Sequence, residues 1–167
     1  MKIDMYVSGA VASGKNKQSG TAIVCTTKWP DGRTQRREMT FGFDAATINV
    51  AAIRSITIAC KAIRQWALLR APQITIHTDS HYAIEALARV DGKFKIEPRT
   101  NLKEVAEARA VVGALVGLSL AYEKFDSGIG NQCAVLARAV ALSQQATDTG
   151  TREVADVSAG LQEKVAN

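Results

Sequence analysis

Residues 73–82 read QITIHTDSHY and combine the pattern of a short strand with the start of a helix. The β-branched residues from Ile74 to Thr78 are typical of a strand. Ser80 favours a helix start because its hydroxyl can accept a hydrogen bond from a backbone N–H of the first turn. Asp79 lies between the two elements. The stretch therefore predicts an α/β domain in which a carboxylate sits at the carboxyl end of a strand.

Outward from this stretch, the hydrophobic pattern predicts four more strands and three more helices. Alternation of apolar and polar residues predicts strands at residues 3–8, 21–29, 34–43 and 118–124. Helical spacing predicts helices at residues 47–70, 101–116 and 131–145, besides the one that begins near Ser80. Residues 9–20 and 91–100 are expected to be loops. This order predicts a five-stranded mixed sheet, an antiparallel meander followed by parallel strands, flanked by helices.

The end of the sequence differs in composition from the rest. Residues 144–151 are polar, and residues 152–166 place apolar side chains at helical spacing, namely Val154, Val157, Leu161 and Val165. We therefore expect one domain over residues 1–145, with a polar linker and a short C-terminal helix over residues 146–167.

The positive charge is concentrated in the first half of the sequence. The net charge is +5, and residues 1–72 carry 11 Lys and Arg against 4 Asp and Glu. Residues 73–167 carry 10 against 12. A basic half can attract the phosphate backbone of a nucleic acid, although a basic surface can also simply keep a protein soluble.

The cysteine content and the hydropathy point to a cytoplasmic protein. The three cysteines have no metal-binding or redox spacing, which is typical of reduced thiols in the cytoplasm. No stretch reaches the roughly 18 apolar residues of a membrane-spanning helix, so no membrane partner is expected.

Four motifs, in order along residues 1–142, resemble ribonuclease H type 1. They are YVSGA at residues 6–10, TINVAA at 47–52, ITIHTDSHY at 74–82 and GNQCAVLARA at 130–139. Each motif alone is weak, but four in the right order and on the expected elements are specific. The resemblance implies a ribonuclease H-like fold and, in active members, metal-dependent cleavage of RNA in RNA/DNA hybrids.

The same resemblance indicates a degenerate active site. The family holds two Mg²⁺ ions with four carboxylates, because Mg²⁺ prefers hard oxygen ligands. The matching positions in this chain are Ser8, Ala52, Asp79 and Ala134. Only Asp79 is acidic, and residues 125–129 lack the histidine of the family's catalytic loop. We therefore expect no cofactor, and Mg²⁺ or Mn²⁺ only if Glu123 or Asp126 completes an atypical site.

Two further patterns have simpler interpretations than a ligand site. Residues 9–16 nearly match a phosphate-binding P-loop, but the chain then enters a strand, whereas a P-loop opens a helix. We interpret this segment as a glycine-rich turn. His77, Asp79 and His81 are close enough in sequence for a mononuclear metal site, although such histidines are more often hydrogen-bonded within the protein.

These observations leave three functional hypotheses. The one we favour is an inactive domain that binds an RNA/DNA hybrid or a duplex without cleaving it, and so is not an enzyme. Its candidate contacts are Lys15, Lys17, Asn49, Arg36 and Arg37. The second is a structural or regulatory scaffold that binds a protein partner, or a second copy of itself, through its alanine-rich helices or its tail. The third is an atypical active ribonuclease H.

Overall fold

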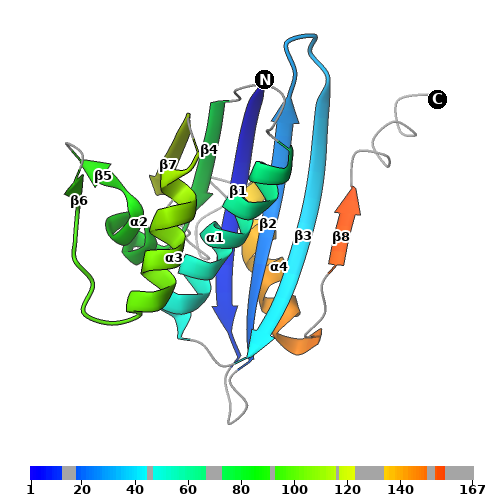
Figure 1. Ribbon diagram of the computed structural model, residues 1–167. Helices are drawn as coiled ribbons and strands as arrows, with labels where there is room; N and C mark the ends of the chain where they lie inside the picture. Colours follow the sequence, from blue (N-terminus) through cyan, green and yellow to red (C-terminus); the bar gives the residue numbers. More distant parts are fainter. Residues whose placement is uncertain are drawn as a thin grey trace.

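The computed structural model describes residues 1–12, 18–44, 47–66, 73–90, 93–115, 117–122, 134–149 and 153–156. Within these residues a mixed six-stranded sheet has the strand order β7-β4-β1-β2-β3-β8 (Figure 1). Its strands are β1 (Lys2–Val11), β2 (Gln18–Lys28), β3 (Thr34–Asp44), β4 (Gln73–Thr78), β7 (Leu118–Tyr122) and β8 (Glu153–Asp156). β1, β2 and β3 form an antiparallel meander, and β4 and β7 are parallel additions. The predicted five strands are thus confirmed, and β8 adds a sixth.

Helices cover both faces of the sheet. They are α1 (Ile48–Trp66), α2 (His81–Leu87), α3 (Leu102–Gly113) and α4 (Ala134–Thr149). Figure 1 shows α1 and α3 in front of the sheet and α4 behind it. Two short strands, β5 (Arg89–Val90) and β6 (Lys93–Phe94), pair beside α2, and β6 lies within residues 91–100, where the sequence predicted a loop. None of the described helices is long and apolar enough to span a membrane.

The alternation of side chains along β1 produces two hydrophobic layers. Ile3, Met5 and Val7 are buried in the core beneath α1. Tyr6 points to the opposite face, where it packs with a smaller cluster that includes residues of α4. The buried stripe of α1 follows the helical spacing seen in the sequence: Ile53, Ile56, Cys60 and Ile63.

Gly9 and Gly20 do not form the predicted loop, because β1 continues to Val11 and β2 begins at Gln18. Both glycines mark places where a helix lies against the sheet. A Cβ atom on Gly9 would lie 2.7 Å from the backbone nitrogen of Ala52, and one on Gly20 would lie 2.7 Å from that of Thr147. The prediction of a loop over residues 9–20 was therefore wrong for the described part. The glycines permit close backbone approach instead of a turn.

The chain beyond residue 145 also departs from the prediction. α4 continues to Thr149, so the start of the expected linker is helical. Residues 153–156 form a strand, antiparallel to residues 37–40 of β3, so the predicted short helix is wrong there. The outer edge of β3 offers unpaired backbone groups, and pairing with them outweighs a weak helical pattern. Residues 157–167 lie outside the described part of the chain.

The helix ends agree with the predictions only in part. Ser80 caps α2 as expected, and its Oγ accepts a hydrogen bond from the backbone N–H of Ala83 at 3.2 Å. Asn101 precedes α3 but makes no side-chain cap bond and adopts a left-handed conformation with φ of 58°. α3 ends at Gly113, before the predicted end at residue 116.

Candidate functional site

The retained carboxylate Asp79 lies beside Ser8. β1 and β4 are parallel neighbours, with Val7 opposite Thr78, so the next residue of each chain segment lies at the same end of the sheet. The Ser8 hydroxyl donates a hydrogen bond to Oδ2 of Asp79 at 3.4 Å. The sequence places these two residues together, and the structure agrees with it.

Ala52 adjoins this pair through its backbone. It lies in the second turn of α1 and is buried. The close approach of Gly9 to Ala51 and Ala52 places this turn of the helix against the residue that follows Ser8. The first helix therefore crosses β1 at the expected position, with a methyl group where the resemblance implies a carboxylate.

The α4 residue that contacts Ser8 is Ser143. Its Oγ lies 3.5 Å from Oγ of Ser8 and donates to the carbonyl oxygen of Val140 at 2.8 Å. Ala134, the expected fourth position, begins the helix nine residues earlier, and a helix rises about 1.5 Å per residue. The side chain of Ala134 is outside the described part, so its placement stays a prediction. Ser143, on the buried face that also holds Ala139, is a polar residue that sequence reasoning missed.

Among the described residues, hydroxyl groups gather at Ser8, the hydrogen-bond partner of Asp79. Thr21 donates from Oγ1 to the carbonyl oxygen of Ser8 at 2.9 Å, which holds the end of β1 in place. Burial raises the pKa of Asp79, while its own backbone N–H and the Ser8 hydroxyl oppose that shift. A buried carboxylate without a cation beside it is disfavoured in its ionised form.

The described residues do not fit a two-metal centre. They contain no group of three or more His, Cys, Asp or Glu side chains that could hold a metal ion. One carboxylate and neutral hydroxyls do not replace the four carboxylates that two Mg²⁺ ions require. Glu123 and Asp126, the acids that could complete an atypical site, lie outside the described residues, so that hypothesis stays a prediction.

The two histidines beside Asp79 have other partners. His77 stacks on Tyr6 with ring centres 4.4 Å apart, and its Nε2 lies 3.4 Å from Oδ1 of Asp4. Nδ1 of His81 lies 3.5 Å from a carboxylate oxygen of Glu85, one turn along α2. Each side chain therefore engages a different residue, and the structure does not gather them into a metal site. The P-loop interpretation also fails, because residues 18–28 form a strand.

The predicted nucleic-acid contacts have mixed outcomes. Asn49 lies in the first turn of α1 and is half-buried, whereas Lys15 and Lys17 are outside the described residues. Arg36 and Arg37 are neighbours on β3, so their side chains leave opposite faces of the sheet and cannot form one patch.

An ion-paired carboxylate neutralises part of this charge. Nη2 of Arg36 lies 3.2 Å from Oε1 of Glu38, and Nη2 of Arg138 in α4 lies 2.8 Å from Oε2. The hydrogen bond from Arg138 is the main cause that lowers the pKa of the Glu38 carboxyl. This buried carboxylate links β3 to α4, and sequence reasoning missed it because its partner is 100 residues away.

Comparisons with known proteins identify the architecture. No family profile and no curated protein matches the chain. Among solved structures, the chain is 20% identical to LC9-RNase H1, a type 1 RNase H with the type 2 active-site motif, with a TM-score of 0.73, covering 99% of this chain and 81% of that one. LC11-RNase H1 in complex with an RNA/DNA hybrid is 21% identical, with a TM-score of 0.66, and the match covers 88% of this chain and 97% of that one. The foamy viral protease-reverse transcriptase in complex with an RNA/DNA hybrid is 16% identical, with a TM-score of 0.66, and the match covers 88% of this chain and 20% of that one.

Proposed function

We propose that this chain, which has a ribonuclease H-like fold, binds nucleic acid and does not cleave it. The observation that supports the proposal best is the contact between Ser8 and Asp79. At this end of the sheet a serine hydroxyl occupies the place where the resemblance implies a metal-binding carboxylate. The site retains one acid of four.

The absence of cleavage follows from the number of ligands. Two-metal hydrolysis requires that the ions fix both the attacking water and the leaving oxygen. Asp79 alone would leave each ion mostly hydrated, and its own ionisation is disfavoured by burial. Loss of the other carboxylates also lowers the negative charge that would repel phosphates at this surface.

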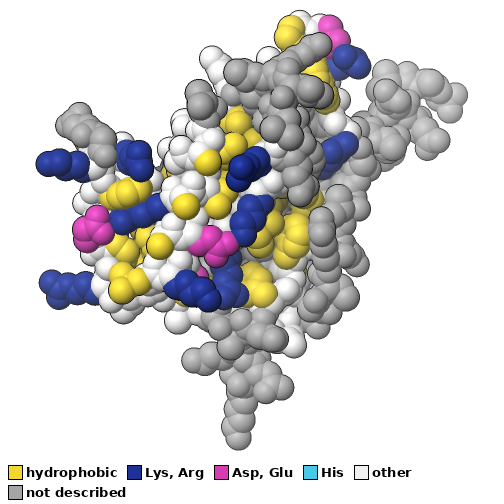
Figure 2. Space-filling model, in the orientation of Figure 1, with side chains coloured by type: hydrophobic (Ala, Val, Ile, Leu, Met, Phe, Trp, Pro, Cys, Tyr) yellow, Lys and Arg dark blue, Asp and Glu magenta, His cyan; other side chains and the backbone are white. Residues whose placement is uncertain are grey.

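Binding is supported by the fold and by the distribution of charge. Structures of LC11-RNase H1 and of the foamy viral enzyme, which share the fold, contain these proteins in complex with RNA/DNA hybrids. Figure 2 shows more Lys and Arg than Asp and Glu side chains on the face that carries α1 and α3. An RNA/DNA hybrid or a duplex is the class of nucleic acid that such a surface would recognise, by its shape and its phosphates.

The proposal is tested with a fluorescent RNA/DNA hybrid, titrated at several salt concentrations. We expect weak binding whose affinity falls steeply with salt, because counterion release drives contact with phosphates. A variant with Lys15→Gln, Lys17→Gln and Arg37→Gln should bind less tightly. Arg36→Gln is the control, because the side chain of this arginine already pairs with Glu38.

Three outcomes would contradict the proposal. If the protein binds heparin as tightly as the hybrid, or does not bind the hybrid at all, a protein-interaction scaffold would be favoured. Cleavage of the hybrid with Mg²⁺ or Mn²⁺ that Asp79→Asn abolishes would establish an atypical ribonuclease H.

A further inference from the structure

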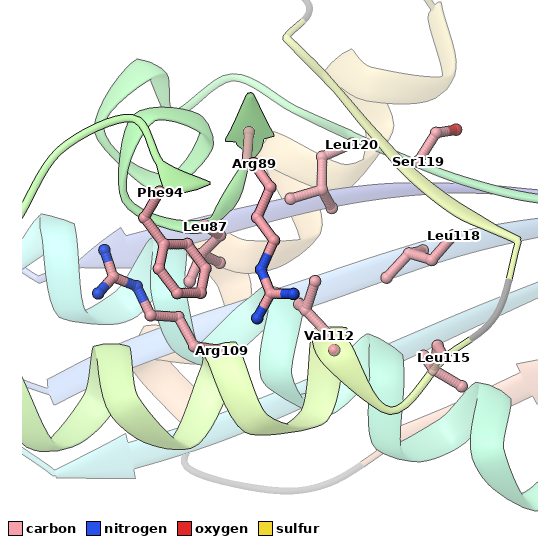
Figure 3. A pocket seen from close by; sticks show the side chains of 11 residues that line it. Leu87, Arg89, Phe94, Arg109, Val112, Leu115, Leu118, Ser119 and Leu120 are labelled. Atoms are coloured by element: carbon pink, nitrogen blue, oxygen red, sulfur yellow. The ribbon is translucent and has the colours of Figure 1, made fainter. Parts of the chain in front are cut away.

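A hollow of about 450 Å³ lies between α2, α3, β7 and the β5–β6 hairpin (Figure 3). Its apolar walls come from Leu87, Val112, Leu115, Leu118 and Leu120. A volume of this size falls within the range of small-molecule sites. The hollow plays no part in the Ser8–Asp79 site, and the inference drawn from it is independent of nucleic-acid binding.

Phe94 and Arg109 form a fixed wall of the hollow. The guanidinium carbon of Arg109 lies 3.6 Å from the ring centre of Phe94. Nε and Nη2 of Arg109 donate to the carbonyl oxygens of Ala86 and Ile96 at 2.9 and 2.7 Å, and Nη1 donates to Glu97 at 3.1 Å. Each nitrogen of this guanidinium group thus donates a hydrogen bond, which keeps Arg109 against the aromatic ring.

Arg89 is engaged differently. Its guanidinium carbon lies 4.8 Å from the ring centre of Phe94. In Figure 3 the side chain extends into the hollow, between Phe94 on one side and Leu118 and Leu120 on the other. Among the residues that the structure describes, no carboxylate pairs with it. Arg89 is exposed, and its guanidinium lies at the hollow without an anionic partner from the described chain.

The remaining polar side chain of the lining is already satisfied. Oγ of Ser119 donates to the carbonyl oxygen of Ile74 at 3.2 Å and lies 3.2 Å from Oγ1 of Thr75. A ligand in the hollow would thus meet the guanidinium of Arg89, the Phe94 ring with the hydrogen-bonded Arg109 on it, and the apolar side chains of the lining. This pattern selects a molecule with one anionic group and an apolar body, because additional polar groups would be buried without partners.

We propose that this hollow binds a small-molecule monocarboxylate with a hydrocarbon body. The carboxylate pairs with the planar guanidinium of Arg89, which suits two parallel hydrogen bonds. The hydrocarbon body lies against Phe94, Val112 of α3 and the leucines of β7. A peptide is a poorer occupant, because its amide groups would find no free partners among the described lining side chains.

The test uses octanoate, with octylammonium and 1-octanol as probes of the same length and different charge. Binding is measured by calorimetry and by chemical-shift changes in the ¹⁵N-labelled protein. We expect octanoate to bind most tightly, and Arg89→Met to weaken it about tenfold or more, since a hydrogen-bonded charge pair is lost. Arg33→Met is the matched control: Arg33 also stacks on an aromatic ring, 5.6 Å from the centre of Trp29, but does not line the hollow.

A second variant tests the cavity separately from the charge. Val112→Trp should fill the hollow and abolish octanoate binding while Arg89 remains. Octylammonium binding as tightly as octanoate, unchanged octanoate binding in either variant, or no octanoate binding at millimolar concentration would overturn the proposal. Tighter binding of a short peptide that ends in leucine would also overturn it. If Arg89→Met does not fold, the chemical shifts of the parent protein decide the question. Changes caused by octanoate at residues outside the lining of the hollow would overturn the proposal.

Discussion

The surroundings of Asp79 disfavour the ionised form of its carboxyl group. Burial raises its pKa, and among the described side chains its hydrogen-bond partner is the neutral hydroxyl of Ser8. A raised pKa in the folded state means that the folded chain binds the proton more tightly than the unfolded chain does. Folding stability therefore falls as pH rises from the unfolded pKa through the raised folded one, and stays lower above it.

We predict that Asp79→Asn stabilises the protein at neutral pH. The gain should vanish at acidic pH, where both states of the parent are protonated, and grow as pH rises through the window between the two pKa values. Urea unfolding between pH 3 and pH 8 measures it. Asp31→Asn is the control with the opposite sign, because a bond from the backbone of Arg33 lowers the pKa of Asp31. A constant difference between Asp79→Asn and the parent at every pH would contradict this interpretation.

Glu38 illustrates the opposite case. Arg138 and Arg36 hold its pKa low, so its ionised form stabilises the fold above the unfolded pKa of a glutamate, and that stability is lost as pH falls through the lowered folded value. Glu38→Gln should therefore destabilise the protein at neutral pH by about 1–3 kcal/mol, since two arginines lose a common partner. The difference from the parent should shrink in acid, as measured by urea unfolding at pH 3 and pH 7. Equal destabilisation at both pH values would show that packing, rather than charge, matters at this position.

Sequence reasoning found some of these residues and missed others for a physical reason. Ser8 and Asp79 end neighbouring parallel strands, and strand ends are predictable from local patterns. Ser143 contacts Ser8 across 135 residues, and Arg138 contacts Glu38 across 100. Such contacts depend on how a helix lies on the sheet, which no local pattern specifies.

At the scale of elements, two glycines determine how closely α1 and α4 approach the sheet. A Cβ atom on Gly20 would lie 2.7 Å from the backbone nitrogen of Thr147, and that backbone cannot move without displacing α4. The helix can therefore reach Ser8 only because residue 20 has no side chain. The same argument applies to Gly9 and α1.

We predict that Gly20→Ala lowers the free energy of unfolding by about 1–3 kcal/mol, the usual penalty for overpacking a core. Gly113→Ala is the matched control in α3. A Cβ atom on Gly113 would lie 3.9 Å from the Arg89 side chain, which is an ordinary van der Waals contact, and alanine favours a helix over glycine by about 1 kcal/mol. The control should be neutral or stabilising. Urea unfolding measures the stability of both variants, as a shift of the midpoint with an unchanged slope. A Gly20→Ala variant as stable as the parent would show that α4 can shift.

The elements that the sequence predicted well are those with local signals. The buried stripe of α1 and the alternation along β1 are periodic, and both were confirmed. The short strands β5, β6 and β8 were missed because two to four residues hold no readable period. Their structure comes from pairing with a neighbouring strand rather than from propensity.

For the whole molecule, the strongest test of the degenerate site is to rebuild it. Ser8→Asp and Ala52→Glu restore two carboxylates around Asp79, and a third can be placed on α4. The contact between Ser143 and Ser8 predicts that Ser143→Asp completes a metal site, whereas Ala134→Asp is the choice implied by the family resemblance.

We predict that the triple variant with Ser143→Asp is less stable than the parent without metal, because three added carboxylates repel one another. Mg²⁺ or Mn²⁺ should then raise its melting temperature in proportion to the logarithm of metal concentration, while the parent responds little. Asp79→Asn in the same background should remove the response. A response in the Ala134→Asp triple variant alone would show that α4 lies in the register of the family.

The pairing of β8 with β3 has a consequence for how the chain behaves at high concentration. An uncovered edge strand is a template on which another molecule can continue the sheet, and this is a common start of aggregation. Residues 153–156 occupy that edge at residues 37–40, beside β3 in Figure 1. Four residues near the end of the sequence thus shield the meander from intermolecular sheet growth. Chains clipped before residue 153 would lose that protection even though every strand of the meander, and the Ser8–Asp79 pair, would remain.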